Sequence, residues 1–291
     1  MENKILYTDI AKDLDKSSPH SYYPRPQFKR DSFFCLNGEW NFEILKSNTV
    51  SNPSGTIIVP FCPESALSGI CTTVNKGDFL HYSRLFTLPE KFKKDRTVIH
   101  FGAVDQICRV YLNGTLLGKH EGGYTPFSFD ITDYIKEKDN CIYVIAEDNL
   151  DKKYPYGKQT DKRGGMWYTP VSGIWQTVWI ESLPENNIEK IQITQSAEEV
   201  YIKVFGGKGK KIFCCEGEDV QFDGDSIRFC PKSKELWTPE NPRLYYFTLS
   251  TETDKIESYF ALREIGVEEF GGIKRLTLNG KPYLFNGLLD Q

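Results

Sequence analysis

Short apolar runs separated by turn residues recur along almost the whole chain, and no other feature limits its possible folds as strongly. Residues 96–104 and 140–148 form two such runs, and residues 174–182 alternate bulky side chains with a period of two. A period of two is typical of β-strands, whose successive side chains point to opposite faces. Long stretches with helical periodicity are absent from the sequence. The pattern therefore predicts an all-β fold.

Two Asn-Gly pairs indicate tight turns between strands. Asn113-Gly114 joins two half-strands, and Asn279-Gly280 lies between two apolar runs near the end of the sequence. Asn-Gly suits a two-residue hairpin because both turn positions require a positive φ. We expect a hairpin at each pair, and a new strand over residues 283–285 after the second.

Residues 184–187, Pro-Glu-Asn-Asn, interrupt the strand pattern and are typical of a linker. Six short runs follow at a spacing of roughly 8–12 residues, which is typical of an immunoglobulin-like β-sandwich. The chain of 291 residues has room for two domains of ordinary size. We therefore expect one larger β-structured domain before the linker and a smaller sandwich after it.

Composition argues against several classes of partner. The net charge of −4 and the pI of about 5.7 speak against binding to nucleic acid or to an anionic membrane. No apolar run approaches the roughly 20 residues that a membrane span needs. The eight cysteines contain no Cys-x-x-Cys pair and the four histidines are scattered, so we expect neither a metal nor a cofactor. The cysteine pattern and an N-terminus without an apolar signal core favour a reducing, cytoplasmic location.

Seven segments resemble, in the same order, segments of glycoside hydrolase family 2, the β-galactosidase and β-glucuronidase family. They include Leu-Asn-Gly-Glu-Trp-Asn-Phe, His-Glu-Gly-Gly-Tyr-Thr-Pro-Phe and Ser-Gly-Ile-Trp-Gln-Thr-Val-Trp. The segments are residues 23–26, 36–42, 59–65, 120–127, 172–179, 236–245 and 278–282. Each is short, but their shared order from about residue 23 onward makes the resemblance specific.

The resemblance implies three regions. The first is a jelly-roll β-sandwich over residues 1–184, a sugar-binding domain of galactose-binding-like type. The second is an immunoglobulin-like β-sandwich over residues 185–264. The third, residues 265–291, is a vestige of the first strand of a catalytic (β/α)₈ barrel. A complete barrel needs about 250 residues, so we expect the rest of it to be missing from this chain.

The resemblance also implies an activity for a longer parent protein. That activity is retaining hydrolysis of a β-glycoside by two glutamates about 5–5.5 Å apart. In this family the acid/base glutamate usually follows an asparagine, and the sequence contains no Asn-Glu pair. We therefore expect both catalytic glutamates beyond Gln291, no catalytic residue in this chain, and no hydrolysis by the chain alone.

Three residues are candidates for a sugar contact in the parent enzyme. In the galactosidase and glucuronidase branches, a loop near residues 161–170 carries an aspartate that reaches the pocket. The matching position here is Trp167, or Gly165 if two residues are inserted. Trp167 and Tyr168 can stack on a pyranose ring, or they can instead pack the jelly roll against the barrel. Asp290, at the expected end of the first barrel strand, is the third candidate.

Three functions remain open on sequence grounds. The leading hypothesis is the non-catalytic N-terminal part of a retaining β-glycoside hydrolase, which braces the barrel, shapes its pocket and meets carbohydrate there. The alternative is a stand-alone carbohydrate-binding module that uses a face of the jelly roll. The third is a pure scaffold with possible homo-oligomer contacts, which analogy of fold does not separate from binding.

Overall fold

The structure, a computed structural model, describes residues 7–162 and 164–288. These residues divide into two compact units: residues 7–24 with 32–183, and residues 25–31 with 184–288. The second unit therefore includes a segment, residues 25–31, that precedes the strands of the first unit in the chain. The domain boundaries predicted from the sequence assign this segment to the first domain instead.

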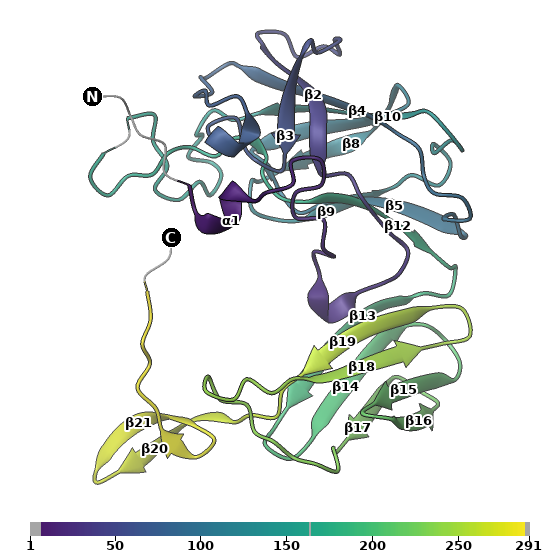
Figure 1. The fold of residues 1–291 in the computed structure, drawn as a ribbon, viewed down its shortest axis with the longest axis vertical. Helices are drawn as coiled ribbons and strands as arrows, with labels where there is room; N and C mark the ends of the chain where they lie inside the picture. Colours follow the sequence, from purple (N-terminus) through teal and green to yellow (C-terminus); the bar gives the residue numbers. More distant parts are fainter. Residues whose placement is uncertain (1–6, 163, 289–291) are drawn as a thin grey trace. The chain divides into compact units, whose positions relative to one another are not determined.

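The first unit is a two-layer β-sandwich (Figure 1). One layer has the strand order β3-β2-β4-β10-β7-β8, the other has the order β1-β12-β5-β9, and β6 pairs with β11. Its elements are α1 (Asp9–Lys12), β1 (Phe33–Cys35), β2 (Gly38–Leu45), β3 (Gly55–Val59), η2 (Ala66–Ser68), β4 (Phe79–Phe86), β5 (Arg96–Phe101), β6 (Val104–Asp105), β7 (Ile107–Leu112), β8 (Thr115–Glu121), β9 (Phe127–Asp130), β10 (Asn140–Glu147), β11 (Gly173–Ile174) and β12 (Val178–Leu183).

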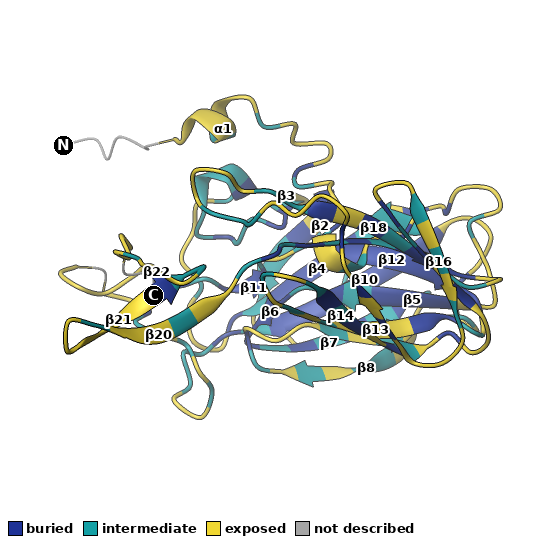
Figure 2. Ribbon diagram, turned by 90° about the horizontal axis from the view of Figure 1, so that it is seen from below, coloured by how far each residue is buried: buried dark blue, intermediate teal, exposed yellow. Residues whose placement is uncertain are grey.

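Alternating side chains build the core between the two layers. In β7, Cys108, Val110 and Leu112 are buried, whereas the residues between them are partly exposed. The large side chains of Trp40 and Tyr82 are also buried there, and Figure 2 shows the buried positions running along the strands. Removing this apolar area from water is the main stabilising contribution to the sandwich.

The apolar run over residues 174–182 is not one continuous strand. β11 pairs with β6, whereas β12 begins at Val178 and pairs with β5. Between the two strands, the indole Nε1 of Trp175 donates a hydrogen bond to the carbonyl oxygen of Gly123 at 2.8 Å. The chain therefore turns a corner from one ladder to another, as strands of a sandwich do where they change sheets. A period of two continues through such a corner, so the sequence pattern gives no sign of it.

The second unit is a smaller sandwich with a separate three-stranded sheet at its C-terminal end. Its two layers have the orders β13-β14-β17 and β16-β15-β18-β19, and the separate sheet has the order β20-β21-β22. Its elements are η1 (Pro26–Phe28), β13 (Ile188–Gln195), β14 (Val200–Gly206), β15 (Lys211–Cys215), β16 (Glu218–Phe222), β17 (Ser226–Phe229), β18 (Tyr245–Ser250), β19 (Lys255–Phe260), β20 (Ile265–Phe270), β21 (Ile273–Leu278) and β22 (Lys281–Pro282).

The two β-sandwiches confirm the predicted all-β class. No helix in the described parts of the chain is long and apolar enough to cross a membrane. Both predicted hairpins are also confirmed. Asn113 and Gly114 have φ of 52° and 86° between β7 and β8, and Asn279 and Gly280 have φ of 53° and 73° between β21 and β22. These positive values explain why each turn carries Asn-Gly.

The prediction of a strand over residues 283–285 is wrong. β22 ends at Pro282, which has no backbone N–H to donate to a ladder. Beyond it, the amide of Tyr283 donates to the carbonyl oxygen of Leu276 at 3.0 Å. Leu284 is then 80% exposed, and residues 283–285 are assigned to no strand. The expectation that these residues begin a barrel stays a prediction.

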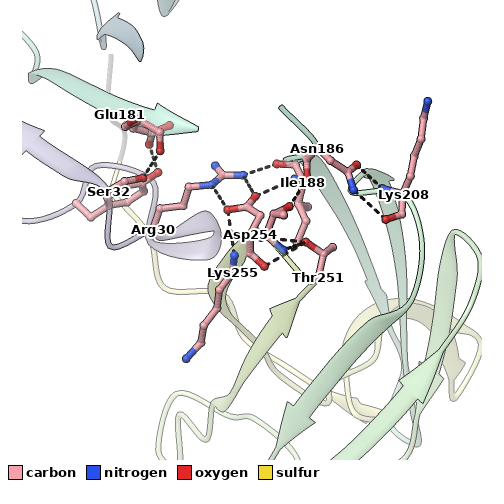
Figure 3. A network of polar contacts seen from close by, with 12 residues as sticks. Arg30, Ser32, Glu181, Asn186, Ile188, Lys208, Thr251, Asp254 and Lys255 are labelled. Atoms are coloured by element: carbon pink, nitrogen blue, oxygen red, sulfur yellow. Dashed lines mark hydrogen bonds and ion pairs between the residues drawn. The ribbon is translucent and has the colours of Figure 1, made fainter. Parts of the chain in front are cut away.

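A buried ion pair fixes residues 25–31 in the second unit (Figure 3). The guanidinium of Arg30 contacts the carboxylate of Asp254 through Nη2–Oδ2 at 2.9 Å and Nε–Oδ1 at 3.3 Å. The two side chains are only 3% and 1% exposed. Arg30 also donates to the carbonyl oxygen of Ile188, whose amide donates to Asp254 at 2.8 Å. Beside this pair, the backbones of Lys29 and Glu257 exchange two hydrogen bonds of 2.9 Å, so the segment covers the outer edge of β19.

Candidate functional site

The loop between β10 and β11, residues 148–172, carries the two aromatic candidates Trp167 and Tyr168 (teal in Figure 1). Their side chains are about half exposed, at 50% and 46%. The loop folds back on itself, because the amide of Tyr168 donates to the carbonyl oxygen of Lys158 at 2.9 Å, and the amide of Thr160 donates to Tyr168 at 3.1 Å. The structure thus exposes both rings on the surface of the first unit, and their contact with a sugar stays a prediction.

Gln159 holds this loop against the sandwich. Its side chain is 9% exposed, and its Nε2 donates to the phenolic oxygen of Tyr124 at 2.9 Å. Its Oε1 accepts a hydrogen bond from the amide of Val171 at 2.6 Å. The backbone bridge between Gln159 and Tyr168 adds a third attachment. One buried amide side chain therefore fixes both ends of the turn that carries Trp167.

Three carboxylates gather where the loop returns to the sandwich, and we call Glu64, Asp105 and Asp148 the acid cluster. Ser172 joins two of them, since its Oγ lies 2.8 Å from Oε1 of Glu64 and 3.0 Å from Oδ2 of Asp148. The ladder between β6 and β11 sets Asp105 opposite Gly173, next to Ser172 in the chain. Asp105 and Asp148 are 2% and 5% exposed, and Glu64 is partly buried.

The pKa values of the acid cluster are raised because it is buried without a cation. Burial, reinforced by the charge of Asp148, raises the pKa of Asp105 to about 7. Burial also raises the pKa of Glu64 and of Asp148. A serine hydroxyl has one proton, so Ser172 donates to one carboxylate and needs a protonated partner to hydrogen bond with the other. None of the three carboxylates forms an ion pair with a residue in the described ranges.

Gly123 permits the close packing around Asp105. A Cβ atom at this position would lie 2.3 Å from Oδ1 of Asp105, far inside van der Waals contact. The carbonyl oxygen of Gly123 accepts the hydrogen bond from Trp175 described above. Oδ1 of Asp105 has no hydrogen-bond partner among the described residues, which agrees with a carboxyl that avoids its charged form. The Gly-Gly-Tyr segment is therefore a packing feature here.

The acid cluster is not built for glycoside hydrolysis. A carboxyl with a pKa near 7 suits a general acid, but Asp105 and Asp148 are too deeply buried to meet a substrate. A cavity of about 510 Å³ on the second unit includes the carboxylate of Glu189, and a cavity of about 240 Å³ on the first includes that of Glu147. Each of these cavities has one carboxylate in its lining, whereas a retaining glycosidase needs two. The acid cluster instead supports the loop.

The described residues contain no group of three or more histidine, cysteine or acidic side chains arranged to bind a metal ion. Asp290, the third candidate for a sugar contact, lies outside the described residues. Sequence reasoning missed Gln159 and the acid cluster. The members of the acid cluster lie far apart in the chain, so no local pattern connects them. A signal was nevertheless present, because Asp105 lies among apolar residues and Asp148 follows a buried strand, and such positions are unusual for a free carboxylate.

Residues 67–184 match the family model described as "Glycosyl hydrolases family 2, sugar binding domain". The matched range includes the loop, Gln159, Ser172 and two of the three members of the acid cluster. Residues 67–184 therefore belong to the family 2 sugar-binding domain. The loop, Gln159, Asp105 and Asp148 therefore lie in this sugar-binding domain, whereas Glu64 precedes it. The resemblance to family 2 that the seven segments indicate is confirmed.

Curated relatives of this chain include both galactosidases and glucuronidases. A β-galactosidase of Thermoanaerobacter pseudethanolicus is 28% identical over 71% of this chain and 31% of its own length. A β-glucuronidase of Streptococcus agalactiae is 26% identical over 89% of this chain and 47% of its own length. This chain therefore spans less than half of either relative.

Solved structures of the family have the same fold. A β-glucuronidase from Ruminococcus gnavus superposes with a TM-score of 0.70 at 20% identity, over 94% of this chain and 51% of that one. A β-galacturonidase from Eisenbergiella tayi gives a TM-score of 0.63 at 23% identity, over 88% of this chain and 46% of that one. At these identities the likeness establishes the arrangement of strands, not the sugar.

Proposed function

We propose that this chain forms the non-catalytic sugar-binding and immunoglobulin-like parts of a retaining β-glycoside hydrolase, and that the two catalytic glutamates belong to a part of the enzyme outside this chain. The match of residues 67–184 to the family 2 sugar-binding domain and relatives named β-galactosidase and β-glucuronidase support this proposal. The single carboxylate in each of the two cavities described above also supports it. In such an enzyme the sandwiches brace the catalytic barrel, and contacts between copies of the chain stay a prediction.

The observation that carries the proposal is the pre-organised loop. Trp167 and Tyr168 are half exposed, yet Gln159 orders the loop that carries them through partly buried hydrogen bonds with Tyr124 and with the amide of Val171. An aromatic ring offers a flat face to the apolar C–H face of a pyranose, and a loop that is already ordered loses little entropy when it binds. We therefore assign the loop as one wall of a sugar pocket whose other walls come from the barrel.

The first experiment measures hydrolysis. We expect the purified chain to give no turnover of chromogenic β-galactosides or β-glucuronides above a mock preparation from the same host. Turnover that co-purifies with the chain and persists after a second chromatographic step would show that the chain holds a complete active site, and the proposal would then be wrong.

The second experiment supplies the missing part. The chain is joined to the catalytic barrel of the T. pseudethanolicus relative, and kcat/KM of the fusion is compared with that of the barrel alone. We expect the fusion to be the more active, and Trp167→Ala to lower its kcat/KM about tenfold through lost stacking. Leu85→Ala, at a residue that is 71% exposed on β4, is the control and should have no effect.

A stand-alone carbohydrate-binding module is the second candidate function. The observation in its favour is the cavity of about 240 Å³ over β4, β7, β8 and β10, whose lining includes Phe79, Ile107 and Lys119. Calorimetry of the chain with oligosaccharides distinguishes the two functions. Millimolar or tighter binding by the chain alone, weakened by Lys119→Ala and unaffected by Trp167→Ala, would favour the module.

We also propose a reducing, cytoplasmic location for the enzyme. All eight cysteines are free thiols, and Cys108 and Cys215 are buried as small apolar side chains. Burial raises the pKa of both thiols to about 12, so they are unreactive thiols. A count of titratable thiols in the unfolded protein should give eight, and a lower count without reductant would indicate disulfides.

A further inference from the structure

The acid cluster holds both ends of the loop of residues 148–172. Asp148 is the first residue of the loop and Ser172 the last, and Oγ of Ser172 lies 3.0 Å from Oδ2 of Asp148. Oδ1 of Asp148 accepts the amide of Leu150 at 2.9 Å, so the same carboxylate orders the first turn of the loop. Oε2 of Glu64 accepts the amide of Ser172 at 3.3 Å. The two points where the loop leaves and rejoins the sandwich therefore depend on carboxylates.

Asp105 lies between the sandwich and the middle of the loop. On the loop side, the side chain of Gln159 is close enough to act on the pKa of Asp105. On the other side, a Cβ atom at Gly123 would lie 2.3 Å from Oδ1 of Asp105, so no space remains there. Asp105 is only 2% exposed. Departure of Gln159 with the loop is therefore the movement that would hydrate this carboxyl.

The titratable groups in and next to the acid cluster include no cation among the described residues. Around Asp105 they are Glu64, Asp148, Cys62, Tyr82 and Tyr124. Burial is the main cause of the raised pKa of Asp105, about 7, and the charges of Asp148 and Glu64 add to it. Ionisation of Asp105 therefore places a further negative charge in a buried region that is already acidic.

Ionisation of Asp105 and opening of the loop consequently favour each other. The pKa of the carboxyl is about 7 while the loop is closed, and hydration would return it toward the ordinary 3.8. Between these values the closed state keeps a proton that the open state has lost. Each pH unit in this window therefore raises the ratio of open to closed loop by up to about tenfold. The closed loop is favoured most below about pH 4, and this advantage is lost as the pH rises to about 7.

We propose that the acid cluster is a pH-sensitive latch, which holds the loop closed in mildly acidic conditions and releases it as Asp105 ionises. The latch itself does not depend on the function proposed above, whereas its effect on a sugar rests on that function. There the closed loop is the state that holds Trp167 and Tyr168 in place, so an acidic pH favours the form of the chain that is ordered for binding.

Hydrogen exchange of the whole chain, in steps from about pH 5 to about pH 8, tests the latch. Each measured rate is divided by the intrinsic rate of the same amide at the same pH, so that only opening is compared. The reporting amides are those of Thr160, Tyr168 and Val171, which form hydrogen bonds within the loop. We expect their protection to fall by up to about tenfold per pH unit until about pH 7 and then to level off. The amides of β10 should stay far more protected.

Asp105→Asn is the decisive variant, and Asp161→Asn is its matched control. Asparagine does not titrate, so the protection of the loop in Asp105→Asn should no longer depend on pH. Asp161 is an exposed carboxylate of the same loop, and Asp161→Asn should keep the pH dependence of the unaltered chain.

Asp148→Asn separates the latch from a purely structural role of the cluster. It removes a charge that raises the pKa of Asp105, so the pH at which protection levels off should move to a lower value. If Asp148 only supported the structure of the loop, its replacement would reduce protection equally at every pH. This shift decides the matter if Asp105→Asn does not fold.

Three outcomes would overturn the proposal. They are constant protection of the loop between about pH 5 and 7, the same pH dependence in Asp105→Asn as in the unaltered chain, or an equal fall of protection in the loop and in β10. The last would mean that the first unit opens as a whole. The measurements use neither a sugar nor a barrel, so their result is separate from the tests of the proposed function.

Discussion

Each unit of this chain buries carboxylates, and two of these buried centres, the Arg30–Asp254 pair and the acid cluster, compensate for the burial in different ways. In the second unit, Asp254 faces the guanidinium of Arg30 and accepts the amide of Ile188. In the first unit, the acid cluster has no cation, shares the hydroxyl of Ser172, and has pKa values raised by burial. An ion pair satisfies a buried carboxylate by charge, whereas the cluster satisfies its carboxylates by leaving them partly neutral.

This difference separates two tasks. The ion pair fixes residues 25–31 in the second sandwich, although this segment precedes the strands of the first sandwich in the chain. The acid cluster supports a loop at the surface, and its protons connect the stability of that region to pH. Four changes, in order of decreasing effect, test whether the two centres differ in this way.

The largest effect is expected for Arg30→Ala. It leaves Asp254 buried without its cation, and the loss of one partner of a buried pair costs about 3–5 kcal/mol in the free energy of unfolding. Urea titration measures this quantity. Lys29→Ala removes the neighbouring pair with Glu257, whose side chains are 51% and 46% exposed, and it should cost less than about 1 kcal/mol. Equal costs for the two variants would contradict the account of the ion pair.

The second effect concerns pH. Folding raises the pKa of Asp105 from an ordinary 3.8 to about 7, so the folded state holds a proton that the unfolded state has lost. The stabilisation is complete below about pH 4 and is lost as the pH rises to about 7. The free energy of unfolding should fall by up to about 1.4 kcal/mol per pH unit in that window.

Asp105→Asn should flatten this pH dependence, because asparagine does not titrate. Urea titrations at several pH values across the window measure the slope for both proteins. Asp161→Asn, at an exposed position in the loop, is the control and should keep the slope of the unaltered chain. Parallel profiles for Asp105→Asn and the unaltered chain would show that Asp105 does not carry the proton.

The third effect is expected for Gln159→Ala. The change removes the partners of Tyr124 and of the Val171 amide, which should cost about 1–2 kcal/mol. The loss should be local, so hydrogen exchange of amides 158–168 should speed up while the strands stay protected. Gln192→Ala on β13, an exposed position, should change neither quantity. Uniformly faster exchange over the first unit would mean that Gln159 supports the whole sandwich.

The smallest effect on stability is expected for Trp167→Ala. The side chain is half exposed, and its removal should change the free energy of unfolding by less than about 0.5 kcal/mol. Its role would then be confined to binding, as measured by kcat/KM of the fusion with the barrel. A large loss of stability would place the indole in the packing of the loop and would weaken its assignment to sugar.

The strands and hairpins were accessible from the sequence because their signals are local. Asn113-Gly114 specifies its own turn, and the alternation of Val110 and Leu112 specifies its own face. The corner at Trp175 was not accessible, because a period of two continues through it. Likewise, residues 283–285 have the composition of a strand, but a strand requires a neighbour to pair with, and composition does not reveal whether one is present.

The site could be predicted from the sequence only in part, because local signals reveal the loop but not the distant residues that support it. The loop with Trp167 and Tyr168 was identified from its position before the Ser-Gly-Ile segment. Its support was not, because Gln159, Asp105 and Glu64 meet only after the sandwich has formed. The pairing of Arg30 with Asp254 is a stronger case: the two residues lie 224 positions apart, and neither has a local pattern that indicates the other.

That separation has a consequence for synthesis of the chain. Residues 25–31 leave the ribosome early, but the strand that begins after Asp254 follows only once the whole first unit has been translated. At about 5–20 residues per second, the delay is on the order of 10 to 40 seconds. Throughout that time Arg30 and Phe28 remain exposed to solvent, while the first sandwich can already fold. The first sandwich can therefore fold first during translation. The second sandwich is completed only after Asp254, the partner of Arg30, has been synthesised.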